Sequence, residues 1–267
     1  MSAVSSQALQ SIRHFPQELI DNIVDELLCD NGDHHTMAQC LTVSRSFRAS
    51  THRHLYAFID LTTIQRVVLL HGLLMEMPDI AGNIRWVHMR VGGDEEGKID
   101  DEVVEWLASD TLLADIFNML PYPKALIWGI WRRIDRNWND LSSELQSAVV
   151  NLFQRPSLTI IAIASLTNFP LSTLHAVPQV KELYLYSVRM QNEDHKQIVI
   201  PHLEVLRIVQ HYWRDPEVQL VTPNLRKLSF DDLGQSCTLA QQALETSMTS
   251  LEQLWLLWAH RPRPACA

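Results

Sequence analysis

The chain has 267 residues, 46% hydrophobic and 20% charged, a composition typical of a folded globular protein. Its 31 acidic and 22 basic side chains give a net charge of −9, which excludes a general attraction to nucleic acid or anionic membranes. The sequence contains no uninterrupted run of about twenty apolar residues and no apolar secretory signal. Its four cysteines lack a disulfide spacing. We therefore expect an intracellular protein, cytoplasmic or nuclear, with reduced thiols and with no nucleic-acid or membrane partner.

Three short helices are predicted within residues 14–60. The first begins at Pro16, whose ring suits a first helical turn, and ends at Asn31-Gly32. A second helix is expected at about residues 33–41, and Ser44 is placed to cap a third. The first helix carries apolar residues along one face, namely Leu19, Ile20, Ile23, Val24, Leu27 and Leu28. A unit this small with so many apolar positions usually needs a neighbour to cover them.

Three pieces of this stretch together resemble an F-box: Phe15-Pro16-x-Glu18-Leu19-Ile20, then Val43-Ser44-Arg45, then Leu55-Tyr56. Phe15 stands where that family more often has Leu. In the family these helices bind a Skp-type adaptor, which joins a cullin-RING ubiquitin ligase. The resemblance therefore implies a Skp-type adaptor, and through it a cullin, as partners. It also implies adaptor contacts by Phe15, Pro16, Leu19, Ile20, Ile23, Leu41, Val43, Phe47 and Leu55.

Two other interpretations of the N-terminal helices stay open. They can form a cap whose apolar face turns inward onto the following domain. A metal-dependent enzyme would instead need His34, His35 and a cysteine to converge around an open site. Cys29 and Cys40 fit better as core positions of their helices, and clear chelate spacing is lacking. We therefore expect no metal and no cofactor.

The remainder of the chain repeats an apolar-x-x-apolar-x-apolar pattern. Five copies begin at Leu158, Val180, Leu203, Leu225 and Leu251, in steps of 22, 23, 22 and 26 residues. Two weaker copies are Ile84/Val87/Met89 and Ala125/Trp128/Ile130. In five of these seven copies a proline stands two residues before the first apolar position, which keeps the approach to each strand extended. One strand per copy is therefore predicted.

Helices are predicted between the repeated strands. A strand at residues 56–61 is expected to precede a helix that is capped by Thr62 or Thr63 and runs to Met77. Further helices are predicted at 101–120, at 141–154 with Asp140 as its cap, and at 239–248.

The repeated region resembles the divergent leucine-rich-repeat arrays that follow F-boxes, including those of fungal families. The asparagine expected after each repeat core is absent, which predicts irregular turns. The resemblance implies an α/β (α+β) fold, with a three-helix F-box followed by an irregular solenoid with a mostly parallel sheet. The expected organisation is a flexible leader at 1–13, the F-box at 14–60 and the repeat domain at 61–267. An α/β domain with a mostly parallel sheet but no true repeat is the alternative. The few residues after the last copy are compatible with C-terminal truncation.

Alternation along each strand places a second set of side chains on the face opposite the core. That face is rich in Trp, Tyr and Arg, the residue types that dominate protein-binding hot spots. The predicted target-binding residues are Trp86, Arg90, Trp131, Tyr184, Tyr186, Arg207 and Trp255. The plainer interpretation is that several of these rings are buried against connecting helices.

The sequence contains no phosphate-binding glycine loop, no nucleophile elbow and no HExxH helix. We therefore expect an interaction protein rather than an enzyme. The first hypothesis is a substrate-recognition subunit of an SCF-type ligase, with an unidentified protein target on the repeat region. The alternative is an interaction scaffold unconnected to ubiquitination, whose N-terminal helices cap the repeats.

Overall fold

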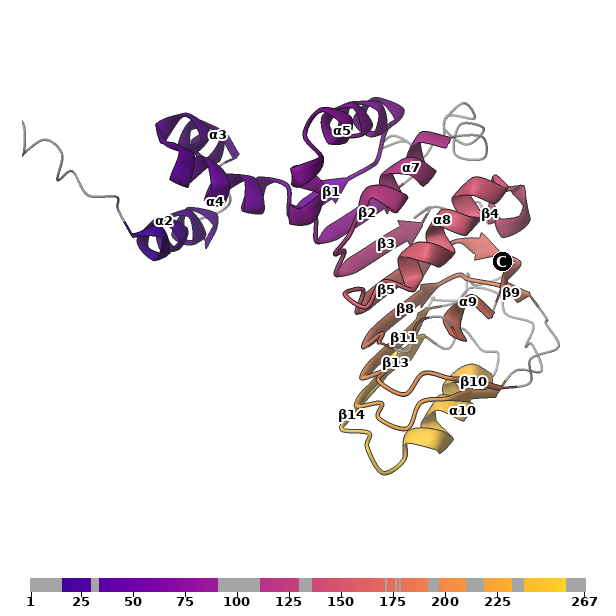
Figure 1. Ribbon diagram of the computed structural model, residues 1–267. Coiled ribbons are helices and arrows are strands. Elements are labelled where there is room, and N and C mark those ends of the chain that lie inside the picture. The colour runs from indigo at the N-terminus through magenta and orange to yellow at the C-terminus, as the bar shows by residue number, and fades with distance from the viewer. Residues whose placement is uncertain are drawn as a thin grey trace, which may run out of the picture. The chain divides into compact units, whose positions relative to one another are not determined.

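The computed structural model describes residues 16–29, 34–90, 111–129, 136–170, 172–175, 177, 179–191, 197–209, 219–231 and 238–257. The chain divides into two compact units, Met1–Phe58 and Ile59–Ala267. The first unit contains helices, and an eight-stranded parallel sheet dominates the second (Figure 1). The fold is therefore mixed α/β with N-terminal helices.

The described residues of the first unit form three helices: α2 (Gln17–Cys29), α3 (His34–Val43) and α4 (Arg45–Leu55). The carbonyl of Pro16 accepts hydrogen bonds from the amides of Leu19 and Ile20 at 3.0 and 3.3 Å, so α2 begins directly after the proline. The Ser44 hydroxyl accepts a hydrogen bond from the Phe47 amide at 3.2 Å, which confirms Ser44 as the cap of α4. The predicted stop at residues 31–32 lies outside the described residues.

The core of this unit consists of Ile20, Val24 and Met37, which are at most 2% exposed. Leu27, Phe47 and Leu55 pack against that core and are partly buried. At the surface, Asp25 Oδ1 lies 2.8 Å from His54 Nε2 and links α2 to α4.

The main sheet contains one strand from each repeated segment, preceded by a first strand, and its spatial order follows the chain order. Its strands are β1 (Phe58–Asp60), β2 (Trp86–Arg90), β3 (Ala125–Gly129), β5 (Ile160–Ala164), β8 (Glu182–Tyr186), β11 (Val205–Val209), β13 (Lys227–Asp231) and β14 (Gln253–Leu257). Each successive pair from β2 onwards is parallel.

The register of the inner strands matches the sequence repeat. Ile161, Leu183, Leu206, Leu228 and Leu254 occupy one row across β5, β8, β11, β13 and β14. The backbone repeats the same contacts at each step: the Lys181 carbonyl accepts from residues 204 and 205, and the Glu204 carbonyl accepts from residues 226 and 227. The five strong copies are therefore equivalent in space.

One of the weaker copies was predicted in the wrong position. Leu126 pairs with Val87 on one side and Ile161 on the other, so the copy on β3 is Pro123/Leu126/Trp128 rather than Ala125/Trp128/Ile130. Both alternatives fit the apolar pattern, because Leu126, Trp128 and Ile130 are all apolar. A slip of two residues keeps every side chain on its original face, so alternation alone does not detect the error.

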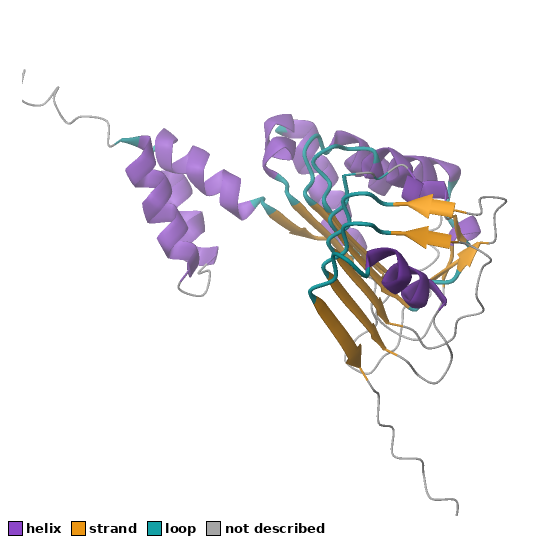
Figure 2. Cartoon of the chain, turned by 90° about the horizontal axis from the view of Figure 1, so that it is seen from below, coloured by secondary structure: helices purple, strands orange, loops and turns teal. Residues whose placement is uncertain are grey.

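The described helices and short strands between the main strands lie on one side of the main sheet, and no described element covers its other face, here called the open face (Figure 2). The helices are α5 (Ile64–Glu76), η1 (Pro78–Asn83), α7 (Thr111–Met119), η2 (Trp138–Asp140), α8 (Ser143–Phe153), α9 (Ser172–His175) and α10 (Thr238–Ser247). Short parallel pairs accompany them: β4 (Arg136–Asn137) with β6 (Leu166–Thr167), β7 (Phe169–Pro170) with β9 (Met190–Gln191), and β10 (Gln197–Val199) with β12 (Gln219–Val221).

Two predicted helix starts can be compared with the observed caps. The Ser142 hydroxyl accepts from the Leu145 amide at 3.1 Å and caps α8. The prediction of Asp140 was wrong, because that residue ends η2 instead. The Thr63 hydroxyl accepts from the Arg66 amide at 3.3 Å and caps α5, as one of the two predicted alternatives. Residues 101–110 of another predicted helix lie outside the described residues.

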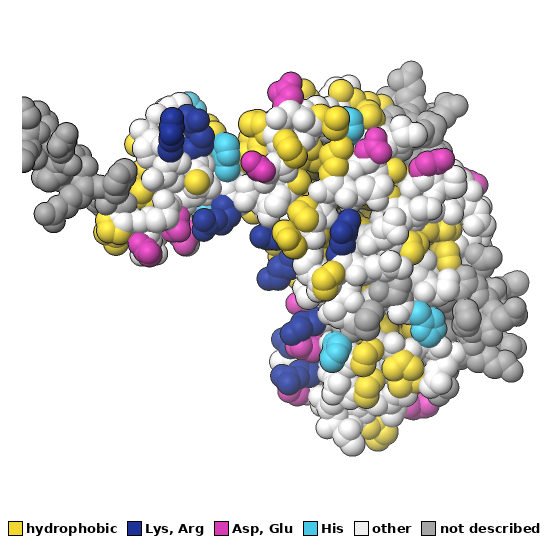
Figure 3. All heavy atoms as spheres, in the orientation of Figure 1, with side chains coloured by type: hydrophobic (Ala, Val, Ile, Leu, Met, Phe, Trp, Pro, Cys, Tyr) yellow, Lys and Arg dark blue, Asp and Glu magenta, His cyan; other side chains and the backbone are white. Residues whose placement is uncertain are grey.

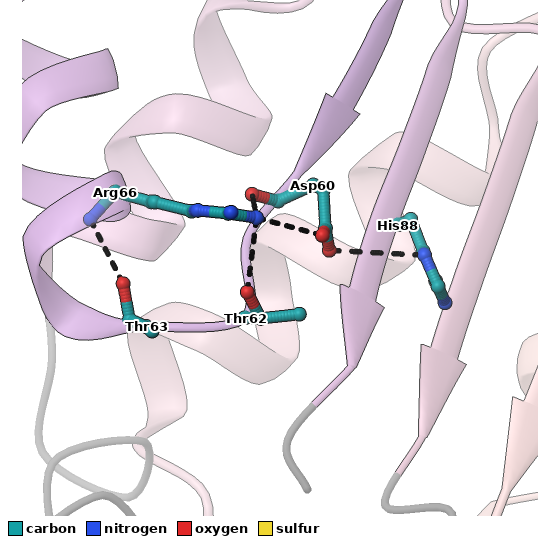
Figure 4. A network of polar contacts seen from close by, with 5 residues as sticks. All are labelled: Asp60, Thr62, Thr63, Arg66 and His88. Atoms are coloured by element: carbon teal, nitrogen blue, oxygen red, sulfur yellow. Dashed lines mark hydrogen bonds and ion pairs between the residues drawn. The ribbon is translucent and has the colours of Figure 1, made fainter.

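The junction of β1, α5 and β2 is held by a polar network (Figure 4). Arg66 donates to Asp60 Oδ2 at 2.7 Å and to the Thr62 hydroxyl at 3.1 Å. His88 Nδ1 lies 3.7 Å from Asp60 Oδ1. Because these groups come from the end of β1, the start of α5 and the middle of β2, they orient the first strand and helix of the second unit.

Candidate functional site

The open face of the main sheet presents its side chains in rows set by the strand register. One row consists of Tyr184, Arg207, Ser229 and Trp255 on β8, β11, β13 and β14. Parallel strands are about 4.8 Å apart, so the outer two members of this row are separated by roughly 14 Å. Three of the seven predicted target-binding residues are therefore brought together in one row.

This row lines a hollow of about 290 Å³. Its lining residues are Tyr184, Val205, Leu206, Arg207, Lys227, Leu228, Ser229 and Trp255. Trp255 is 59% exposed, whereas Arg207 and Tyr184 are half-buried. The volume lies near the lower limit of small-molecule pockets, so the hollow is suited to one or two side chains of a partner.

The side chains beside the hollow hold one another in fixed positions. The Tyr184 and Tyr186 rings are stacked with their planes 4° apart and their centroids 6.5 Å apart. The Arg207 guanidinium lies 5.8 Å from the centroid of the Tyr186 ring. The Tyr184 hydroxyl donates to Glu182 Oε2 at 2.7 Å. Burial, together with this hydrogen bond to Glu182, raises the pKa of Tyr184 to about 12, so its phenol is neutral at physiological pH.

The other predicted target-binding residues do not join this hollow. Trp86 lies on β2 in a different row, the row that leads through Ala125 and Ile160 to Glu182. Arg90 ends β2, but its side chain is outside the described residues, and so is the whole of Trp131. The corrected register on β3 gives Ala125, Ile127 and Gly129 for the open face.

The small side chains predicted for this face bring two strands close together. A Cβ added to Gly129 would meet the Cβ of Ala164 and lie 2.8 Å from its Cα. Ala162 and Ala164 are buried although they are on the open face. The absence of a side chain at Gly129 is what allows this close approach to Ala164.

A second surface lies on the helical unit. Leu19 and Ile23, one helical turn apart on α2, are 46% and 40% exposed, and Val43 at the end of α3 is 64% exposed. At about 100° per residue, Leu19 and Ile23 fall to one side of the buried pair Ile20 and Val24. The apolar face of α2 is therefore wider than the part of it that packs against the core of the unit. The remaining part of that face is exposed to solvent.

The predicted adaptor-binding residues differ in how far they are exposed to solvent. Pro16, Leu19, Ile23 and Val43 are exposed, and Leu41 is half-buried. Phe47 and Leu55 pack partly against the core, and Ile20 belongs to it. With 2% of its surface exposed, Ile20 supports the unit from inside and offers almost no area to a partner. Phe15 lies outside the described residues.

Within the ranges that the structure describes, no three His, Cys, Asp or Glu side chains are arranged to hold a metal ion. Cys40 is a buried free thiol in α3. No described helix combines the length and apolar character needed to cross a bilayer.

A scan against protein-family models found no match to this chain, and a search of curated proteins found none either.

Proposed function

We propose that this protein is a substrate-recognition subunit of an SCF-type cullin-RING ubiquitin ligase. The helical unit acts as an F-box that binds a Skp-type adaptor, and the parallel sheet is a leucine-rich-repeat-like solenoid that binds a target protein. The chain has no catalytic chemistry of its own in this proposal. It raises the local concentration of a target lysine near the conjugating enzyme.

The observation that carries the proposal is the exposed apolar stripe formed by Leu19 and Ile23 on α2. The packing of the helical unit itself leaves this stripe uncovered, and an uncovered apolar surface usually marks a binding site. Fully burying a Leu or Ile side chain contributes about 1.5–3 kcal/mol, so two half-exposed residues offer useful binding energy to an apolar partner surface. Leu19 belongs to the Phe-Pro-x-Glu-Leu-Ile part of the F-box resemblance, and Ile23 follows one helical turn later.

The target-binding half of the proposal is supported by the order of the sheet. Its strands follow one another in chain order, and from β5 onward they do so at steps of 22, 23, 22 and 26 residues, a regularity that supports a repeat array. The helices cover one face, so the open face remains available to a partner (Figure 1).

Co-purification with a Skp-type adaptor tests the adaptor half. The test variant is Leu19→Glu with Ile23→Glu, since glutamate is a good helix former and suits the first turns of a helix. The matched control is Val68→Glu with Leu69→Glu, two residues of α5 that are 49% and 72% exposed. We expect the natural chain and the control to retain the adaptor and the test variant to lose it. If all three folded chains fail to retain it, the helices do not bind this adaptor and the proposal is wrong.

A further inference from the structure

The hollow on the open face has a charge pattern that points to one kind of ligand. Arg207 and Lys227 are its ionisable residues other than tyrosine, and none of the described residues that line it is acidic. The nearest acid on β8, Glu182, already accepts the hydrogen bond of Tyr184. Asp231 lies one row further along by strand register. The hollow therefore presents two cations within a mainly apolar wall.

Nearby charges outside the hollow are mostly paired. Figure 3 shows basic and acidic side chains following one another along the edge of the sheet where the strands begin. There, Lys181 Nζ lies 3.3 Å from Glu204 and Arg226 lies 3.9 Å from Glu252. Each of these pairs neutralises its own charges, whereas no acidic side chain of the described residues forms an ion pair with Arg207 or Lys227. The hollow is therefore the more attractive place for an anion.

Arg207 is held for recognition rather than for packing. Its Nε is buried and has no hydrogen-bond partner among the described residues, which leaves one donor unsatisfied. Stacking on Tyr186 orients the guanidinium, and the Ser229 hydroxyl occupies the next place in the row. Planar guanidinium donors match a carboxylate well, and a rigid guanidinium loses less entropy on binding.

We propose that this hollow binds an acidic side chain of a target peptide, an Asp or Glu flanked by apolar residues. Arg207 and Ser229 take the carboxylate, and Tyr184 and Trp255 take the apolar neighbours. A carboxylate is favoured over a phosphate because a dianion is more costly to bring into an apolar hollow with one guanidinium. This inference deepens the target-binding half of the proposed function and rests on it.

The test is a selection of random peptides displayed on phage against the purified full-length chain. We expect the recovered sequences to be enriched in Asp or Glu next to aliphatic or aromatic residues. One recovered peptide is then synthesised in three forms, with the acid retained, replaced by its amide, or replaced by phosphoserine. The amide form should bind roughly tenfold more weakly, because it lacks the charge that Arg207 recognises.

Single substitutions test whether the peptide binds in the hollow. Arg207→Gln and Trp255→Ala should each weaken the acidic peptide about tenfold or more. Arg226→Gln and Met248→Ala are matched controls, because they remove an exposed arginine and an exposed large apolar side chain outside the hollow, and they should leave binding unchanged. Circular dichroism checks that every variant is folded.

Three outcomes overturn the inference: no enrichment of acidic residues, equal binding by the amide form, or tighter binding by the phosphoserine form. No loss of affinity in folded Arg207→Gln overturns it as well. No adaptor is present in these experiments. A negative result therefore argues against the acidic-peptide site and leaves the adaptor-binding half of the proposed function untouched.

Discussion

Leucine-to-alanine changes along one row of the sheet should have very different costs at inner and outer strands. Leu206 on β11 and Leu228 on β13 are fully buried, whereas Leu254, at the equivalent position of β14, is 45% exposed. The substitution is chemically identical at the three positions. Only the surroundings differ, so the comparison isolates the effect of burial.

The expected magnitudes follow from those exposures. Leu→Ala at a fully buried site costs about 2–5 kcal/mol, because the transfer free energy is lost and a cavity remains. Full burial of a Leu side chain contributes about 1.5–3 kcal/mol, and Leu254 is only about half buried. Its replacement by Ala leaves no enclosed cavity, so the expected loss of stability is about 1 kcal/mol. For a unit of this size, about 1 kcal/mol lowers Tm by roughly 2–4 °C.

Differential scanning calorimetry of the full chain measures the difference. We expect Leu206→Ala and Leu228→Ala each to lower the Tm of the sheet unit by roughly 4–20 °C, and Leu254→Ala by no more than about 4 °C. Val205→Ala, on the open face of β11, serves as the control for shortening a half-buried side chain. Equal losses at Leu254 and at the two inner positions would refute the assigned register or the exposure of β14.

Three other changes give separate tests. Gly129→Ala should lower Tm, because the added Cβ would lie 2.8 Å from Ala164 Cα, and an unchanged Tm would contradict that close approach. Ser142→Ala should cost about 1 kcal/mol through loss of the α8 cap, whereas Asp140→Ala should be nearly neutral, as measured by urea unfolding. Tyr184 holds its proton in the folded state up to a pKa of about 12, above the value of 10.0 in the unfolded chain, so its contribution to stability should fall as pH rises between these values. An ultraviolet phenolate titration should lose its highest-pH component in Tyr184→Phe, and an unaltered titration would show that Tyr184 is not the shifted group.

Much of the sheet could be predicted from the sequence because each inner strand follows an apolar leading residue at a regular step. Four residues after such a leading residue stand Tyr184, Arg207, Ser229 and Trp255. This equal spacing predicts that the four residues lie in one row across the sheet, as the strand register shows. The convergence of cations and aromatic rings in one hollow also depends on side-chain directions, which the spacing does not contain.

The sequence was less informative where two patterns fit equally well. At β3, Leu126, Trp128 and Ile130 are all apolar, so apolarity did not distinguish two registers that differ by two residues. Asp140 and Ser142 are both good capping residues, and only the local backbone decides which is used. On α2, Leu19 and Ile20 are adjacent apolar residues with opposite exposure, because helix packing decides which part of a wide apolar arc is covered.

The central claim is that the exposed stripe of α2 binds a Skp-type adaptor, and calorimetric titration of purified adaptor into the full chain tests it most directly. The account predicts one adaptor per chain, with affinity reduced at least about tenfold by Leu19→Glu or by Ile23→Glu alone. Val68→Glu on α5 should bind like the natural chain. No measurable heat of binding with the natural chain across several temperatures, or equal affinity for the folded α2 variants, would contradict the account.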